Sequence, residues 1–277
     1  MKNLRLALLA LAAIVALLLG ASFLDRAFRT ERPPAVVAKT PDRPAAEPAV
    51  APSAALTASR RTIEASIAES PDYVRFFDRL RLVFPSEYET ILNALAQQAV
   101  SGGKPSSVDE IMANSVMALR KSDGALAAKA SDQALAQIFA LQLGEMRTLA
   151  QQDVHLCVAF LYGASGSGFL TFAADHRPLI ADAAIAGLDA MNSGRMDQVQ
   201  RGAPSDSDFQ ALDKALTEKG LNRPEIEALL DGKTADPPIA DERMCAAGQT
   251  YLEALAGLAT PVRARLYGLA VDLMAKS

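Results

Sequence analysis

The sequence predicts an all-α protein: a multi-helix bundle of about nine to ten helices behind an N-terminal transmembrane helix and a Pro/Ala-rich linker. Half of the 277 residues are hydrophobic, but only 5% are aromatic and none is Trp. An apolar, Ala-rich composition with few aromatic residues favours close-packed helices over strands. From Thr57 onward, apolar residues recur every three or four positions, the period of a helix with one buried face. We therefore expect three regions, at residues 1–24, 25–56 and 57–277.

The first region contains an uncharged run at residues 6–24, composed mainly of Leu, Ala, Ile and Val. At about 1.5 Å per helical residue, a run of this length nearly spans the ~30 Å hydrocarbon core of a bilayer. It also exceeds the apolar region of about 7–15 residues that is usual in a signal peptide. We expect an uncleaved, single-pass anchor in a bacterial inner membrane. Secretion after cleavage near Ser22 is the alternative.

Two signals disagree about the orientation of this anchor. Lys2 and Arg5 precede the run, whereas five basic residues follow it. The basic flank of a membrane helix tends to stay in the cytoplasm, so this count favours a cytoplasm-facing domain. The composition of the next region instead suits a spacer in the cell envelope. We expect the helical domain to face the periplasm and keep the cytoplasm-facing orientation as the alternative.

Residues 25–56 are predicted to be a disordered tether. Six Pro residues lie among Ala and Val, without a helical or an alternating period. Proline-rich chains favour an extended polyproline II conformation of about 3.1 Å per residue, so the tether could reach up to ~90 Å.

In the first half of the remaining chain, stop and start signals divide the sequence into helices. Ser70 is a candidate capping hydroxyl, and Pro71 suits a first helical position. The residues from Ser107 to Glu110 have the form of a capping box. Val154–Tyr162 is apolar almost all round, which predicts a central, buried helix that Gly163 would cap.

The second half is predicted to contain five more helices. They are expected over 179–191, 205–219, 224–230, 241–258 and 262–274. Asn192, Ser193 and Gly194 are expected to end the first of them. The connections are short, so successive helices should pack antiparallel.

The two cysteines of the chain are candidates for a disulfide. Cys157 and Cys245 each lie on the apolar face of a predicted helix, and Gly248 would let the two backbones approach closely. An exported location would permit oxidation. Two buried free thiols are the alternative, which holds if the domain is cytoplasmic.

A possible catalytic region lies around the glycine-rich turn at 163–168. Ser165 or Ser167 could act as a nucleophile with His176 and Asp175. Adjacent Asp and His side chains rarely orient each other as a catalytic triad requires, and Asp175 is better placed to cap the following helix. A hydrolase that uses the Ser165–His176 region is therefore the second functional hypothesis.

Composition argues against other classes of function. The formal net charge is −4, and no cluster of Lys and Arg with interleaved aromatic residues predicts a nucleic-acid interface. Only two His and two Cys occur, which nearly excludes a structural zinc site formed by the protein alone. His155 and Cys157 are two positions apart on a predicted helix, so they cannot bind one metal from adjacent turns. No cofactor is expected. The first hypothesis is thus a non-catalytic, membrane-tethered protein that binds or scaffolds another envelope protein, in one version as a chaperone.

Overall fold

A computed structural model of the chain describes residues 53–102, 106–163 and 166–276. This part of the chain contains twelve helices and no strand, which confirms the all-α class. The expected number of nine to ten helices is too low. The expected membrane anchor and nearly all of the expected linker lie outside the described residues. Among the residues that are described, no helix is both long and apolar enough to cross a membrane.

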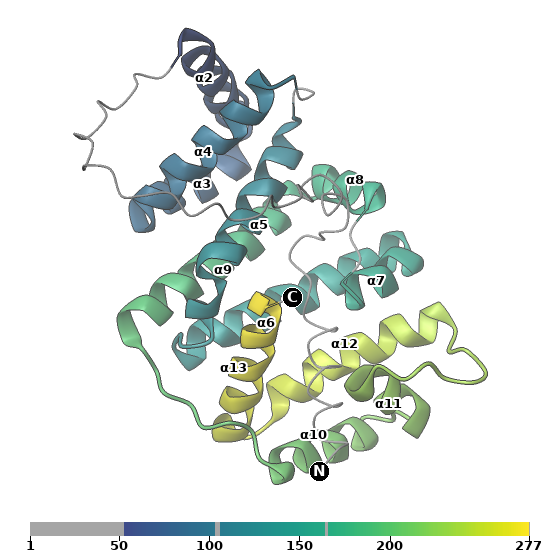
Figure 1. Cartoon of the computed structure of the whole chain (residues 1–277). Coiled ribbons are helices and arrows are strands. Elements are labelled where there is room, and N and C mark those ends of the chain that lie inside the picture. Colours follow the sequence, from purple (N-terminus) through teal and green to yellow (C-terminus); the bar gives the residue numbers. More distant parts are fainter. Residues whose placement is uncertain (1–52, 103–105, 164–165, 277) are drawn as a thin grey trace, which may run out of the picture.

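The helices are numbered as in Figure 1. Their bounds are α2 (Ala54–Ala68), α3 (Pro71–Val83), α4 (Pro85–Val100), α5 (Val108–Ala127), α6 (Asp132–Gln152), α7 (Val154–Leu161), α8 (Ser167–Asp175), α9 (Arg177–Asp197), α10 (Asp206–Glu218), α11 (Arg223–Asp231), α12 (Asp241–Gly257) and α13 (Thr260–Lys276).

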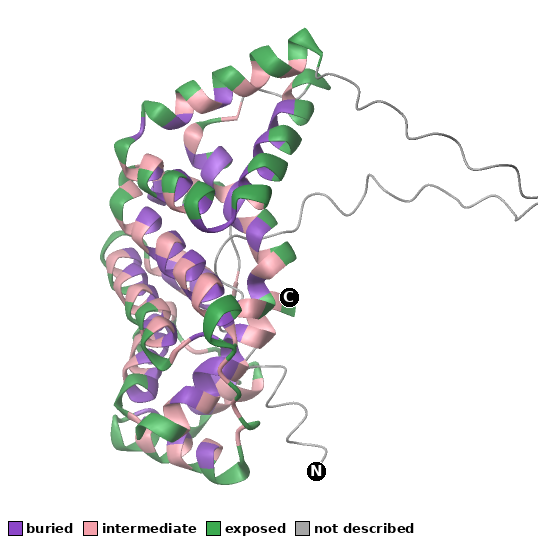
Figure 2. Cartoon of the chain, turned by 90° about the vertical axis from the view of Figure 1, so that its left-hand side faces the viewer, coloured by how far each residue is buried: buried purple, intermediate pink, exposed green. Residues whose placement is uncertain are grey.

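Helix α9 lies at the centre of the arrangement, where it packs against α3, α5 and α6. At one end, α2, α3 and α4 pack on one another. At the other end, α10 and α11 pack on α12, while α13 lies against α5 and α7 lies against α6 and α12. Figure 2 shows the buried residues gathered on the inward faces of the helices. A single cluster of buried hydrophobic side chains extends from α2 to α13.

The apolar sequence of α7 predicted that this helix would be central and buried. The central helix is instead α9. Most of the buried residues of α9 are Ala or Gly, and small side chains let several helices approach one axis. In α7 only Cys157, Phe160 and Leu161 are buried, and the side chain of His155 is 82% exposed. Helix α7 therefore covers the edge of the α6–α12 pair.

Two helices account for most of the difference in number. Helix α2 begins at Ala54 within the expected linker, and the hydroxyl of Ser53 accepts a hydrogen bond from the Leu56 amide. Helix α8 begins at Ser167, within the turn expected at 163–168, and continues through residues for which no helix was expected. Its Phe169 and Phe172 are buried, and this burial outweighs the low helix propensity of the Gly and Ser residues at its start.

Helix α9 also continues past the residues that were expected to end it. Gly194 packs so closely on α5 that a Cβ atom there would lie 1.8 Å from the carbonyl oxygen of Leu126. The Ser193 hydroxyl accepts a hydrogen bond from the backbone amide of Ser131. These residues contact other helices instead of forming a turn. Helix α9 ends at Asp197 and is followed by Gln198, whose φ is 47°.

The capping expectations have mixed outcomes. The capping box of Ser107 and Glu110 is present at the start of α5. Ser70 makes no capping hydrogen bond: its hydroxyl is buried, and it has no hydrogen-bond partner among the described residues. Asp175 does not cap α9 either, since it is the last residue of α8 and His176 occupies the position before α9.

Candidate functional site

The two cysteines lie together between α7 and α12. The structure joins Cys157 to Cys245 in a disulfide, with the Cα atoms 5.8 Å apart and both residues buried. Gly248 faces the interface as well: a Cβ atom there would lie 2.7 Å from Met146 and 2.8 Å from Leu161. The absence of a side chain at Gly248 thus allows the close packing of α12 that the bridge requires.

The described members of the serine–histidine region do not converge. Ser165 lies outside the described residues. Ser167 and Asp175 are the first and last residues of α8, which at about 1.5 Å per residue places them roughly 12 Å apart along the helix. The His176 Nε2 atom lies 2.9 Å from the side-chain oxygen of Gln152 on α6. His176 is therefore engaged with α6 and not with the serine.

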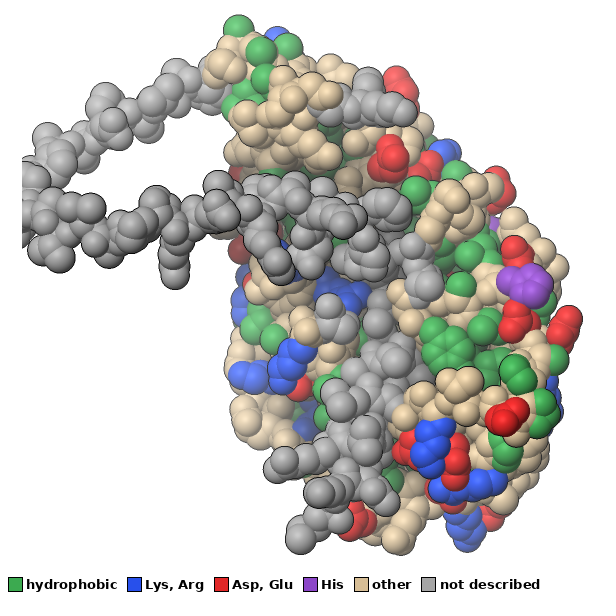
Figure 3. Space-filling model, turned by 45° about the vertical axis from the view of Figure 1, so that its right-hand side comes forward, with side chains coloured by type: hydrophobic (Ala, Val, Ile, Leu, Met, Phe, Trp, Pro, Cys, Tyr) green, Lys and Arg blue, Asp and Glu red, His purple; other side chains and the backbone are tan. Residues whose placement is uncertain are grey.

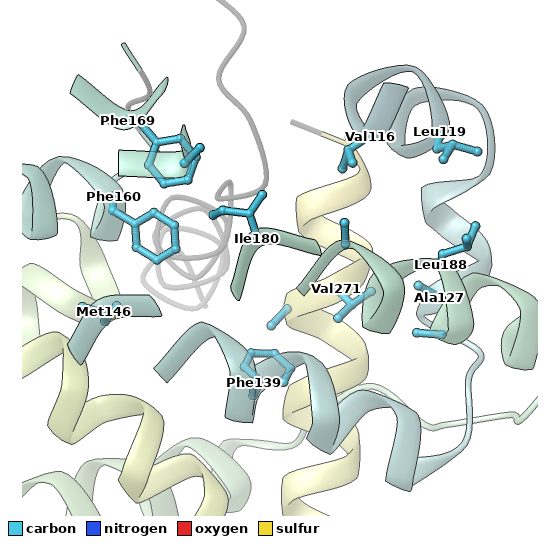
Figure 4. Packing of buried hydrophobic residues seen from close by; sticks show 14 of the residues in the cluster. Val116, Leu119, Ala127, Phe139, Met146, Phe160, Phe169, Ile180, Leu188 and Val271 are labelled. Carbon is cyan, nitrogen blue, oxygen red and sulfur yellow. The ribbon is translucent and has the colours of Figure 1, made fainter. Parts of the chain in front are cut away.

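A different group of polar residues surrounds a small cavity between α3, α5, α6, α8 and α9. The cavity has a volume of about 20 Å³, which is enough for one water-sized group. Tyr73, Asp109 and Glu145 line it together with apolar residues of α8 and α9. Figure 4 shows two of these, Phe169 and Ile180.

Glu145 is the unusual member of this group. It is 1% exposed, and its Oε1 atom has no hydrogen-bond partner among the described residues. Burial raises the pKa of Glu145 to about 8, because a carboxylate loses its hydration there without gaining a cation. The side chain is consequently a neutral acid at pH 7, able to donate or accept a hydrogen bond in the cavity.

The neighbouring carboxylate, Asp109, is held in the opposite state. Its Oδ1 atom accepts hydrogen bonds from the Tyr73 hydroxyl, at 2.8 Å, and from Arg177 Nε, at 2.9 Å; a second Arg177 nitrogen donates to Oδ2 at 2.8 Å. Burial alone would raise the pKa of Asp109, but the bonds from Arg177 and Tyr73 outweigh burial and keep the pKa below its ordinary value. Asp109 is thus an ionised residue whose charge is already neutralised within the fold.

A larger apolar groove lies next to this cavity, between α3, α5, α6, α9 and α13. It has a volume of about 60 Å³ on the measure used for the inner cavity, and about 590 Å³ when all space between its atoms, including open solvent, is counted. Its walls are almost entirely carbon, apart from Arg120, which donates from Nε to the Met274 carbonyl oxygen at 2.9 Å. Figure 4 shows the wall residues Val116, Leu188 and Val271.

The interpretation of the sequence missed this site, although one signal was present. The apolar stripe of α6 includes Leu135, Phe139, Met146 and Leu149, and it is interrupted by the buried Gln142 and Glu145. A charged residue on an otherwise apolar face marks either a helix end or a buried polar site. The partners of Glu145 come from helices distant in sequence, so the spacing within α6 alone could not identify them.

Elsewhere the described charges are largely paired. Two other helix-starting acids, Asp208 and Glu225, are clamped by Arg265 and Arg243 from other helices. Figure 3 shows acidic and basic side chains interspersed on the visible face. Within the described ranges, no group of three or more His, Cys, Asp or Glu residues is arranged to hold a metal ion.

Comparisons with known proteins identify no relative of this chain. No protein-family model matches the chain, and neither the search of curated proteins nor the search of solved structures finds a match. Any functional conclusion must therefore be drawn from the residues themselves.

Proposed function

We propose that this chain is a membrane-tethered helical protein of the bacterial cell envelope, with its helical region in the periplasm and a non-catalytic role in binding or scaffolding another envelope protein. A chaperone for an exported partner is one form of this role. The uncharged run at residues 6–24 supplies the membrane attachment in this proposal, and residues 25–56 supply the reach.

The observation that carries the location is the disulfide between Cys157 and Cys245. Disulfides persist in oxidising compartments such as the periplasm and are rare in the cytosol. Both cysteines of the chain are used, so no free thiol remains. The bridge thus supports export over the cytoplasm-facing alternative.

For the partner surface, we propose the region where the C-terminal ends of α3 and α9 lie side by side. Leu82 and Met196 are 73% and 72% exposed, the two most exposed of the large hydrophobic residues described. Arg195 holds the two helix ends together, since it donates to the Val83 carbonyl oxygen at 2.7 Å and lies over the ring of Phe84. Exposed apolar side chains on a rigid helix pair are suited to contact another protein.

The proposal is tested by site-specific photo-crosslinking in intact cells. A crosslinker replaces Leu82 or Met196 in two separate variants, with Lys214 as the control position because it is exposed and polar on α10, a helix away from the C-terminal ends of α3 and α9. We expect one discrete adduct from the first two positions and none from Lys214. The same adduct from all three positions, or no adduct, would contradict this surface.

Topology is tested separately, by fusing a periplasm-active and a cytoplasm-active reporter to the C-terminus. Activity of the periplasmic reporter in the membrane fraction is expected. Activity of the cytoplasmic reporter alone would refute the export proposal, and recovery of the mature protein outside the membrane would indicate cleavage near Ser22.

A further inference from the structure

The polar cavity and the apolar groove are neighbours along the α5–α9 interface. Val116 of α5 and Ala184 of α9 line both of them. On α3, Tyr73 lines the polar cavity and Phe76, one helical turn later, lines the groove. Val116 and Ala184 are therefore the residues at which the carbon walls of the groove meet the polar cavity that Glu145 lines.

We propose that these two compartments bind a short primary alkylamine, with its alkyl chain in the apolar groove and its ammonium group beside Glu145. The space has the required shape, because the inner cavity of about 20 Å³ takes one water-sized group and the larger groove takes the chain. Such a division into an apolar pocket with one polar end is common in small-molecule sites.

The charges around the inner cavity favour an ammonium group over other polar ends. The titratable residues that face it are Tyr73 on α3, Asp109 on α5 and Glu145 on α6, while α8 and α9 contribute only apolar walls. Arg177 of α9 lies behind Asp109 and already neutralises it. Glu145 is the acid left without a cation, so a bound ammonium would supply the missing partner.

Binding in this form releases one proton. The neutral carboxyl group of Glu145 gives its proton to solvent, whereas the ammonium group of the ligand keeps its three protons. The buried pair is therefore a carboxylate and a cation. A buried carboxylate is tolerated when such a partner is present. The apparent affinity should accordingly increase with pH while the ligand remains protonated, as far as the pKa of about 8 that Glu145 has in the empty site.

The test uses the full chain in lipid nanodiscs and follows thermal unfolding by circular dichroism. Hexylamine, hexanol and hexanoate are compared, because they share one chain and differ in the polar end. We expect a saturable rise in Tm with hexylamine, and a smaller effect of the other two. Glu145→Gln, which preserves shape and removes the charge, should weaken hexylamine binding at least tenfold.

Two further variants complete the design. Glu253→Gln removes a partly exposed acid that pairs with Arg147 and Lys219, and it should leave the hexylamine effect intact. Ala184→Leu fills the shared wall and should abolish the effect. Equal Tm shifts in wild type and Glu145→Gln, equal effects of hexanol, or no effect would overturn the proposal. A preference for hexanoate would also overturn the proposal, because it would indicate that the polar end of the ligand lies at Arg120 and not at Glu145.

Discussion

Glu145 and Asp109 show, at the scale of single residues, how neighbouring carboxyl groups reach opposite protonation states. Both line the same cavity. Asp109 receives hydrogen bonds from Arg177 and Tyr73 and stays ionised, whereas burial without a partner makes Glu145 a neutral acid. Glu145 is the more deeply buried of the two, and only Asp109 has a cation and a hydroxyl to offset its burial.

This state of Glu145 predicts a pH dependence of stability. Its pKa is about 8 in the folded protein and 4.5 in the unfolded chain, so between these values the folded state binds a proton that the unfolded state has lost. The contribution of Glu145 to the free energy of unfolding should therefore fall as pH rises from 4.5 to 8, by at most about 1.4 kcal/mol per pH unit, and level off above.

Glu145→Gln isolates this contribution from those of other groups. The amide cannot lose a proton, so the variant should be more stable than wild type at pH 8, on the order of 4 kcal/mol, with a smaller difference near pH 5. Urea unfolding followed by circular dichroism at several pH values measures the difference. A difference that stays constant across this range would show that Glu145 is ionised in the folded protein.

The disulfide provides a second prediction at this scale. Alkylating the denatured protein without reduction should modify neither cysteine, and both should react after reduction. The bridge spans a sequence separation of 88, for which chain-entropy models give roughly 4–5 kcal/mol, so Cys157→Ala/Cys245→Ala should be strongly destabilised. Two modified cysteines before reduction would instead mean buried free thiols.

The contacts of a single residue could be predicted from the sequence when its partners lie close to it along the chain. The Ser107 capping box is formed within four consecutive residues, so its pattern is visible in the sequence. The pairing of Cys157 with Cys245 needed only the apolar faces of two helices. The cavity of Glu145 is assembled from five helices, and no spacing within one helix identifies its other walls.

At the scale of elements, the same reasoning explains which helices were predicted. Caps and periodicity indicated α10 and α12 near their observed bounds and α5 near its observed start. They failed where tertiary contacts overruled local signals, as in α8, whose buried Phe169 and Phe172 hold a Gly- and Ser-containing segment helical. They failed again in α9, whose Asn192–Gly194 segment resembles a terminus but packs on α5 and α6.

Gly194 supplies a prediction for this contact between elements. In Gly194→Ala the new methyl group would lie 1.8 Å from the Leu126 carbonyl oxygen, so α9 and α5 must separate. A loss of several kcal/mol in the free energy of unfolding is expected.

Gly144→Ala on α6 is the matched control, because a methyl group there meets nothing closer than 4.0 Å. It should be neutral or stabilising by up to about 1 kcal/mol, since Ala favours a helix over Gly. Both variants are compared by urea unfolding. Similar effects of the two substitutions would argue against a close α5–α9 contact.

At the scale of the whole molecule, the fold depends on the small residues of α9 and on bridges between helices distant in sequence. The three clamped acids Asp109, Asp208 and Glu225 each lie in the first turn of a helix and bind an arginine from another helix. Each clamp fixes the start of a helix in place, where an acid is also favoured by the helix dipole. These contacts lie entirely within the helices from α5 to α13.

The last prediction concerns which part of the chain folds independently. Residues 53–277 should form a soluble helical domain, because the helices from α2 onward bury their apolar faces on one another. A fragment that begins at residue 57 removes the first residues of α2 and the Ser53 cap, including Leu56, which packs against the core. It should be less stable than the longer fragment by about 1 kcal/mol or more, and Ser53→Ala in the longer fragment should reproduce the part due to the cap.

Circular dichroism and urea unfolding of the three proteins measure these differences. Aggregation of the longer fragment, or a large content of strand, would show that the preceding residues are needed for folding.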